Sequence, residues 1–127
     1  MTFARRVFLI AGVYGLVALL PQYFLETRNG LDYPPAINHP EYYYGFVGVA
    51  LAWQVLFLLL SRDPVRYRVM MIPAVLEKAS FGIATIVLYA TQRTSAFMLV
   101  CGLVDLFLGG LFAISYVKTA ERAATTR

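Results

Sequence analysis

The sequence contains one cysteine and one histidine, and this scarcity excludes several kinds of cofactor chemistry. Cys101 is alone, so the chain forms neither an internal disulfide nor a redox-active cysteine pair. With His39 as its only histidine, the chain lacks the paired histidines that hold haem or catalytic zinc. Phosphate-binding glycine loops and serine-nucleophile motifs are also missing. We therefore expect neither a cofactor nor a bound metal ion.

Charged residues are scarce as well, and long apolar runs take their place. Charged residues make up 14% of the 127 residues, against about 25% in a soluble domain, whereas hydrophobic residues reach 60%. Four apolar stretches cover approximately residues 7–25, 42–60, 69–90 and 96–117. Each is close to the roughly 20 residues that a helix needs to cross a hydrocarbon layer about 30 Å thick. The sequence therefore predicts one domain over residues 1–127, an all-α, integral membrane, four-helix up-down antiparallel bundle.

The net charge of +4 indicates the orientation in the membrane rather than a nucleic-acid partner. Eight basic residues lie at one side of the predicted bundle: Arg5, Arg6, Arg62, Arg66, Arg68, Lys118, Arg122 and Arg127. Only Arg28 and Arg93 lie at the other side. Because short loops rich in lysine and arginine stay in the cytoplasm, we expect both termini there. We expect the basic side to attract anionic membrane lipids, and we expect no nucleic-acid partner.

The connection between the first two spans is the longest of the three connections. Asn29-Gly30 predicts a turn within it. A new helix is expected to begin at Pro40, with Asn38 or His39 as its cap, because proline suits the first position of a helix. Three consecutive tyrosines follow, and they are typical of the aromatic belt at a membrane interface.

Small residues within the spans indicate where the helices approach one another. Gly102, Asp105 and Gly109 are three and four residues apart, so they share one face of the fourth span. That face is expected to point into the protein, because lipid would not accept the carboxylate. In the third span, Pro73 lies one turn before Glu77 and is expected to kink or loosen the helix there.

Polar and ionisable side chains within the spans are the main indication of function. Five of them, from all four spans, lie about 12 to 19 Å from the basic side, given a rise of about 1.5 Å per residue. They are Tyr14, Gln54, Glu77, Lys78 and Asp105. An unpaired charge at the centre of a bilayer costs about 2.5–3.5 kcal/mol. We therefore expect the first four to face the bundle interior, with Asp105 close enough to pair.

This polar layer has two interpretations. In the first, its members only satisfy one another's charges and hydrogen bonds, and so fix how the helices pack. In the second, it is a functional cavity in which Lys78 neutralises Asp105 and leaves Glu77 at least partly protonated at neutral pH. The candidate residues for binding a ligand or a proton are Glu77, Lys78, Asp105, Gln54, Tyr14 and Trp53. No catalytic residue is assigned.

Three segments carry a resemblance to known membrane proteins: HPEYYYGFVGVALAWQ at residues 39–54, SRDPVRYR at 61–68 and PAVLEK at 73–78. The chain resembles small uncharacterised four-span bacterial membrane proteins and is similar in general plan to the DoxX-like group. The resemblance covers the layout of the whole chain. It implies a protein of the bacterial inner membrane, and no catalytic or quinone-binding residue is implied by it.

Three functions remain open from the sequence. In the first, the protein binds or moves a small hydrophobic or protonatable ligand through the polar layer, and we expect a homo-oligomer because four helices barely enclose a pocket. Alternatively, it is an accessory subunit of a larger membrane complex, with a purely structural polar layer. The third alternative is a membrane-embedded acid–base enzyme, such as an isomerase, acting on an apolar substrate.

Overall fold

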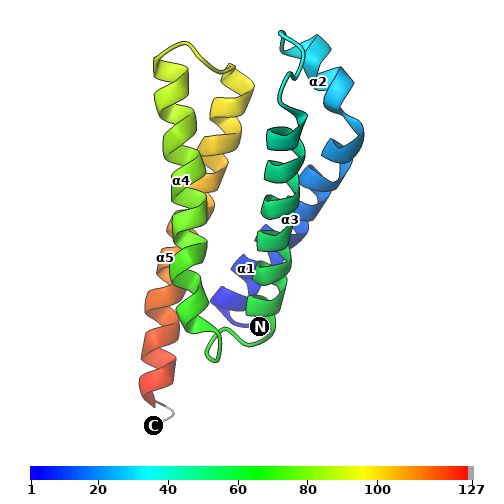
Figure 1. Ribbon diagram of the computed structural model, residues 1–127. Helices are drawn as coiled ribbons and strands as arrows, with labels where there is room; N and C mark the ends of the chain where they lie inside the picture. The colour runs from blue at the N-terminus through cyan, green and yellow to red at the C-terminus, as the bar shows by residue number, and fades with distance from the viewer. Residues whose placement is uncertain (126–127) are drawn as a thin grey trace.

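The computed structural model describes residues 1–125, and all regular structure in that range is helical (Figure 1). Its elements are α1 (Phe3–Leu19), η1 (Leu20–Phe24), α2 (Glu26–Asp32), α3 (Pro40–Arg62), η2 (Arg68–Met70), α4 (Met71–Ala90) and α5 (Ala96–Thr125). Four segments are long and apolar enough to span a membrane: α1 with η1, α3, η2 with α4, and α5. The chain is therefore a multi-pass membrane protein, and the predicted all-α bundle is confirmed.

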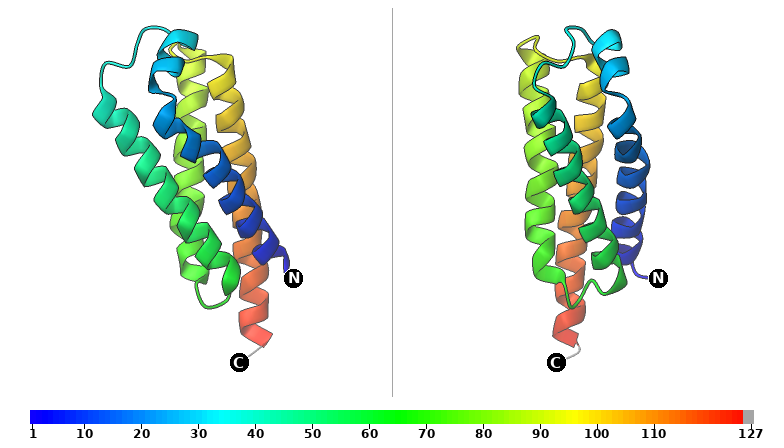
Figure 2. Two further views of the ribbon diagram at one scale, coloured as in Figure 1. Left: turned by 90° about the vertical axis from the view of Figure 1, so that its right-hand side faces the viewer. Right: turned by 45° about the vertical axis from the view of Figure 1, so that its right-hand side comes forward.

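The spanning helices run alternately up and down, so both ends of the chain lie at the same end of the bundle (Figure 1). We call this the terminal end. α5 extends past the other helices there (Figure 2). Arg127, one of the basic residues assigned to this side, lies outside the described residues.

The start of α3 agrees with the prediction from sequence. The helix begins at Pro40, and its cap is His39. The His39 side chain does not bond the helix backbone; its Nδ1 lies 3.1 Å from Glu41 Oε1 instead. Proline thus occupies the first helical position, where no intrahelical acceptor is available for an N–H group.

The prediction of a turn at Asn29-Gly30 is wrong, because both residues lie within the short helix α2. Asn29 Nδ2 donates hydrogen bonds to Gln22 Oε1 over 2.9 Å and to Tyr43 Oη over 3.0 Å. Tyr43 in turn donates to the Gln22 backbone oxygen over 2.6 Å. These contacts hold α2 against η1 and α3, and such tertiary contacts override a local turn preference.

The irregular backbone of the third span lies at its start rather than one turn before Glu77, where Pro73 was expected to kink or loosen the helix. Pro73 occupies the first turn of α4, so its ring removes no hydrogen bond within that helix. The irregular backbone is the 3₁₀ turn η2, which immediately precedes α4.

The four spanning helices form two closely packed pairs. α1 packs mainly on α3, and α4 packs mainly on α5. The two pairs meet chiefly through α1 and α5, whereas α3 and α4 have little contact with each other. Figure 2 shows α3 inclined away from α4 toward the end opposite the terminal end.

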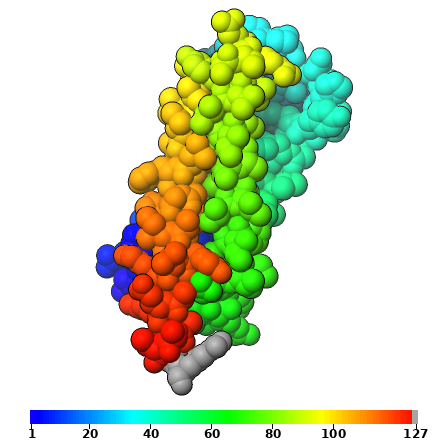
Figure 3. Space-filling view, turned by 90° about the vertical axis from the view of Figure 1, so that its left-hand side faces the viewer, coloured from blue at the N-terminus to red at the C-terminus, as the bar shows by residue number. Residues whose placement is uncertain are grey.

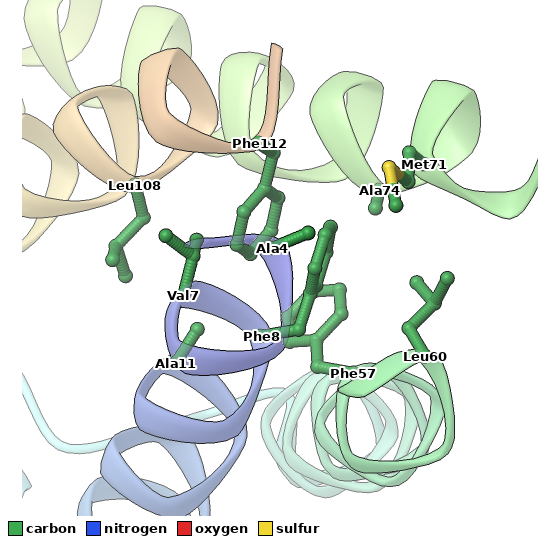
Figure 4. Close-up of a cluster of buried hydrophobic side chains, with 10 residues drawn as sticks. All are labelled: Ala4, Val7, Phe8, Ala11, Phe57, Leu60, Met71, Ala74, Leu108 and Phe112. Carbon is green, nitrogen blue, oxygen red and sulfur yellow. The ribbon is translucent and has the colours of Figure 1, made fainter. Parts of the chain in front are cut away.

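The apolar core lies in the half of the bundle nearer the terminal end, where the two pairs meet (Figure 4). Phe8 of α1, Phe57 of α3 and Phe112 of α5 are all fully buried there. The Phe112 ring centroid lies 4.3 Å from that of Phe8 and 4.9 Å from that of Phe57. Offset and edge-to-face pairs of this kind add to the stability gained from burial.

Small residues bring α4 and α5 together, and Figure 3 shows the two helices side by side along their length. A Cβ atom added at Gly102 would overlap the Thr85 hydroxyl and would lie 2.7 Å from Thr85 Cβ. A Cβ atom at Gly82 would lie 2.8 Å from the Gly102 backbone oxygen. In lipid, where burial drives association only weakly, close backbone approach of this kind is the main source of helix–helix attraction.

We expect Gly102→Ala to destabilise the protein by about 1–3 kcal/mol, as overpacking does in a tight interface. Thr85 is branched at Cβ, so rotation of its side chain does not relieve the overlap. The measurement is thermal unfolding in detergent. Gly110→Ala is the matched control, because nothing lies within 4 Å of a Cβ atom at that position. Equal stability of the two variants would contradict this account of the α4–α5 interface.

Candidate functional site

Lys78 is buried where α3, α4 and α5 meet. Its Nζ lies 3.4 Å from Asp105 Oδ1 on α5 and 3.7 Å from Glu77 Oε2 on α4. The ammonium group also lies 5.2 Å from the centre of the Phe57 ring on α3. Glu77 and Asp105 are largely buried, with side chains 18% and 15% exposed. We call Glu77, Lys78 and Asp105 the charged cluster.

The glycines of α5 make room for this cluster. A Cβ atom at Gly109, one turn after Asp105, would lie 3.1 Å from Lys78 Cβ. Gly102, one turn before Asp105, faces Thr85 of α4. The three α5 residues therefore share a face that points into the protein, as their spacing predicts. The expected pairing of Lys78 with Asp105 is also present.

The charged cluster contains two carboxylates and one ammonium group, so it carries one excess negative charge when all three are ionised. Lys78 donates a hydrogen bond to Asp105 over 3.4 Å. Glu77 Oε2 is buried and has no hydrogen-bond partner among the described residues. The negative charge of Glu77 is therefore the less completely compensated of the two, and a buried excess charge attracts a proton or a second cation.

A groove of 880 Å³ lies between α3 and α4, and Glu77 contributes to its wall. The rest of the wall is mainly apolar and includes Phe46 and Trp53 of α3 and Leu76 and Phe81 of α4. Phe46 and Leu76 are 52% and 64% exposed, so the groove opens at the surface that faces lipid. The arrangement places one partly compensated carboxylate on the wall of an apolar groove. This is a typical composition for a small-molecule site.

Trp53 shares the groove with Glu77, but Gln54 lies in a different interface. Gln54 is buried as predicted, and its Nε2 donates to the Ala50 backbone oxygen over 2.9 Å. Its side chain fills the space beside Gly15 of α1. Gln54 therefore helps α1 and α3 to pack, and its described contacts are with that interface rather than with the charged cluster.

Tyr14 is less enclosed than predicted: the residue is 43% exposed, although it lies close enough to Asp105 and Cys101 of α5 to interact with them electrostatically. The glycine face of α1 is the one that meets α3: a Cβ atom at Gly12 would lie 2.7 Å from the Leu58 side chain. Tyr14 precedes Gly15 by one residue and so points about 100° away from that face. Depth along a helix, which the sequence gives, does not determine which way a side chain points.

Apart from Trp53, the aromatic residues of the groove wall were not predicted from the sequence. The ring centroids of Phe46 and Phe81 lie 5.9 Å apart across α3 and α4. In the sequence, each is one aromatic residue among many in an apolar span. No spacing within either helix indicates that they face each other.

We expect Lys78→Met to destabilise the protein by about 3–5 kcal/mol, because it leaves buried carboxylates without their cation. Glu77→Gln should leave stability nearly unchanged, since Lys78 keeps its closer partner Asp105 and the amide matches the carboxyl in size. The measurement is unfolding in detergent, followed by helical circular dichroism.

The double variant Lys78→Met with Asp105→Asn is the control for this prediction. If the loss comes from the uncompensated charge, the double variant should be more stable than Lys78→Met alone. A protein that tolerates Lys78→Met but unfolds with Glu77→Gln would reverse the roles assigned to the three residues.

No protein-family model, no curated protein and no solved structure matches the chain. The charged cluster and the groove beside it are therefore the observations from which a function is inferred.

Proposed function

We propose that the protein binds a small lipophilic molecule with a protonated amine, which enters the groove between α3 and α4 from the lipid. The observation that carries the proposal is the position of Glu77. It is the less compensated carboxylate of the charged cluster, and it lines the wall of the groove. An ammonium group on the ligand would supply the cation that the cluster lacks.

The apolar wall suits the remainder of such a ligand. Aromatic side chains from both helices line the groove, among them Phe46, Trp53 and Phe81. Aromatic rings offer apolar area to a hydrocarbon chain and an electron-rich face to a cation. A second carboxylate, Glu41, lies on the groove wall near the start of α3, toward the end opposite the terminal end.

Binding of a cation in this groove would be linked to proton release. In the absence of a ligand, a proton is the simplest way to balance the excess negative charge of the cluster. An ammonium group beside Glu77 takes over that role, so the proton leaves as the ligand binds. The same exchange in reverse would release the ligand, which is the step that movement of a ligand through the protein requires.

Trp53 is the only tryptophan in the chain, so its fluorescence reports on the groove directly. We expect the fluorescence to change with dodecylamine concentration and to reach saturation. Dodecanol should bind about tenfold more weakly than dodecylamine, because a hydrogen bond to a charged group contributes about 1.5–3 kcal/mol. Glu77→Gln should remove the preference for the amine and leave binding of the alcohol unchanged.

Ser80→Ala is the matched control, since Ser80 also lines the groove but its hydroxyl already donates to the Glu77 backbone oxygen over 3.0 Å. It should keep the preference for the amine. If Glu77→Gln binds dodecylamine as tightly as the natural protein does, Glu77 is not the group that recognises the ligand.

We also infer that the protein lies in a bacterial inner membrane with the terminal end in the cytoplasm, as its DoxX-like plan and its charges suggest. The loops and helix ends at the terminal end contain most of the basic residues, including Arg5, Arg66 and Lys118. Short basic segments are retained on the cytoplasmic side during insertion.

Cysteine labelling in intact cells tests this orientation. Cys101→Ala removes the natural thiol, and Thr27→Cys in α2 or Ala124→Cys in α5 then supplies a single new one. A membrane-impermeant maleimide should label the cysteine at position 27 in intact cells, and should label the one at position 124 only after lysis. Labelling of both positions from outside would overturn the orientation.

A further inference from the structure

A second cleft lies at the terminal end of the bundle, apart from the charged cluster. It has a volume of 330 Å³ and lies between the start of α1, the loop after α3 and the last turns of α5. Its wall includes Phe3, Arg5, Asp63, Lys118 and Arg122. Because the spanning helices end at this level, the cleft faces the headgroup layer of the membrane rather than the acyl chains.

This cleft is basic. Arg5 and Lys118 contribute two cations to its wall, and Asp63 is the one carboxylate among its lining residues. Asp63 Oδ1 already accepts a hydrogen bond from the Arg66 backbone N–H over 3.1 Å. A concave surface with an excess of positive charge concentrates anions.

Neighbouring groups hold Arg5 and Lys118 at the cleft without neutralising them. The Arg5 guanidinium donates to the backbone oxygen of Arg62, the last residue of α3. A guanidinium has five N–H donors, so this bond uses only part of its capacity. Lys118 Nζ lies 4.4 Å from the centre of the Phe3 ring, which orients the ammonium group but carries no counter-charge.

The first turn of α1 adds backbone donors to the same wall. Phe3 and Ala4 line the cleft, and the first N–H groups of a helix have no acceptor within that helix. The Thr2 hydroxyl oxygen accepts from the Arg5 backbone N–H over 3.2 Å, which caps the turn. The positive end of a 17-residue helix thus reinforces the charge of the basic side chains.

We propose that this cleft binds the phosphate group of an anionic phospholipid. A phosphate suits a guanidinium, an ammonium and helix amides together, because its oxygens accept several hydrogen bonds at once. The cleft lies at headgroup depth, and Val65 on its wall is 44% exposed, so apolar surface for the lipid chains begins beside it. This site is independent of the groove between α3 and α4.

Native mass spectrometry of the detergent-purified protein tests the proposal, with phosphatidylglycerol and phosphatidylcholine as probes. We expect phosphatidylglycerol to bind more tightly, and Arg5→Gln or Lys118→Gln each to weaken its binding about fivefold. Arg66→Gln is the matched control, because it removes the same charge at the same end of the bundle but outside the cleft. Equal weakening by Arg66→Gln would mean diffuse surface attraction and would overturn the proposal.

Asp63→Asn tests the same site in the opposite direction. The amide oxygen can still accept from the Arg66 N–H, so the loop should fold, while the loss of the carboxylate should tighten phosphatidylglycerol binding about fivefold. Unchanged binding in this variant would contradict the proposal even if the other variants fail to fold.

Inorganic phosphate is the second probe: if it binds as tightly as phosphatidylglycerol, the cleft serves a soluble phosphate and the lipid assignment is wrong.

Discussion

The ammonium group of Lys78 is the constraint on which the packing of the helices depends. A cation in the middle of a spanning helix is stable only beside counter-charges, and Asp105 and Glu77 supply them at 3.4 and 3.7 Å. Since Asp105 belongs to α5, this contact sets the register between α4 and α5. A shift of one residue would turn Asp105 by about 100°, away from Lys78. Gly102 and Gly109 let the two backbones approach closely enough for the pair to form.

The groove follows from the same pairing of helices. α4 uses its small-residue face to meet α5, and α1 uses its glycine face to meet α3. The backbones of α3 and α4 therefore have little contact, and side chains such as Phe46 and Phe81 meet between them. Glu77 precedes Lys78 by one residue and therefore points about 100° away from it along the helix surface. One residue of this adjacent pair lies in the α4–α5 interface, and the other lies on the wall of the groove.

Properties local to one helix could be predicted from the sequence, whereas among properties that depend on two helices only the Lys78–Asp105 pair was predicted, because a buried lysine requires a counter-charge. The four spans and the inward face of α5 follow from apolar length and from the spacing of Gly102, Asp105 and Gly109. The depth of Tyr14 also follows from the sequence, but how far the residue is enclosed depends on which face of α1 meets α3, and Tyr14 is 43% exposed. Likewise, the α2 helix depends on hydrogen bonds to Gln22 and to Tyr43, which local turn preferences cannot indicate.

The composition of the charged cluster is the reason for proposing a binding site rather than a purely structural polar layer. A cluster that served only to fix the packing of the helices would need one carboxylate for one ammonium group, and the Lys78–Asp105 pair meets that need. The second carboxylate, Glu77, must share the one ammonium group with Asp105 or be balanced by a proton, so packing of the helices does not require it. Glu77 lies on the wall of an apolar groove that is open to lipid, and under the proposed function a cation that arrives from the membrane balances its charge there. The excess negative charge is thus better explained by a binding site than by packing alone.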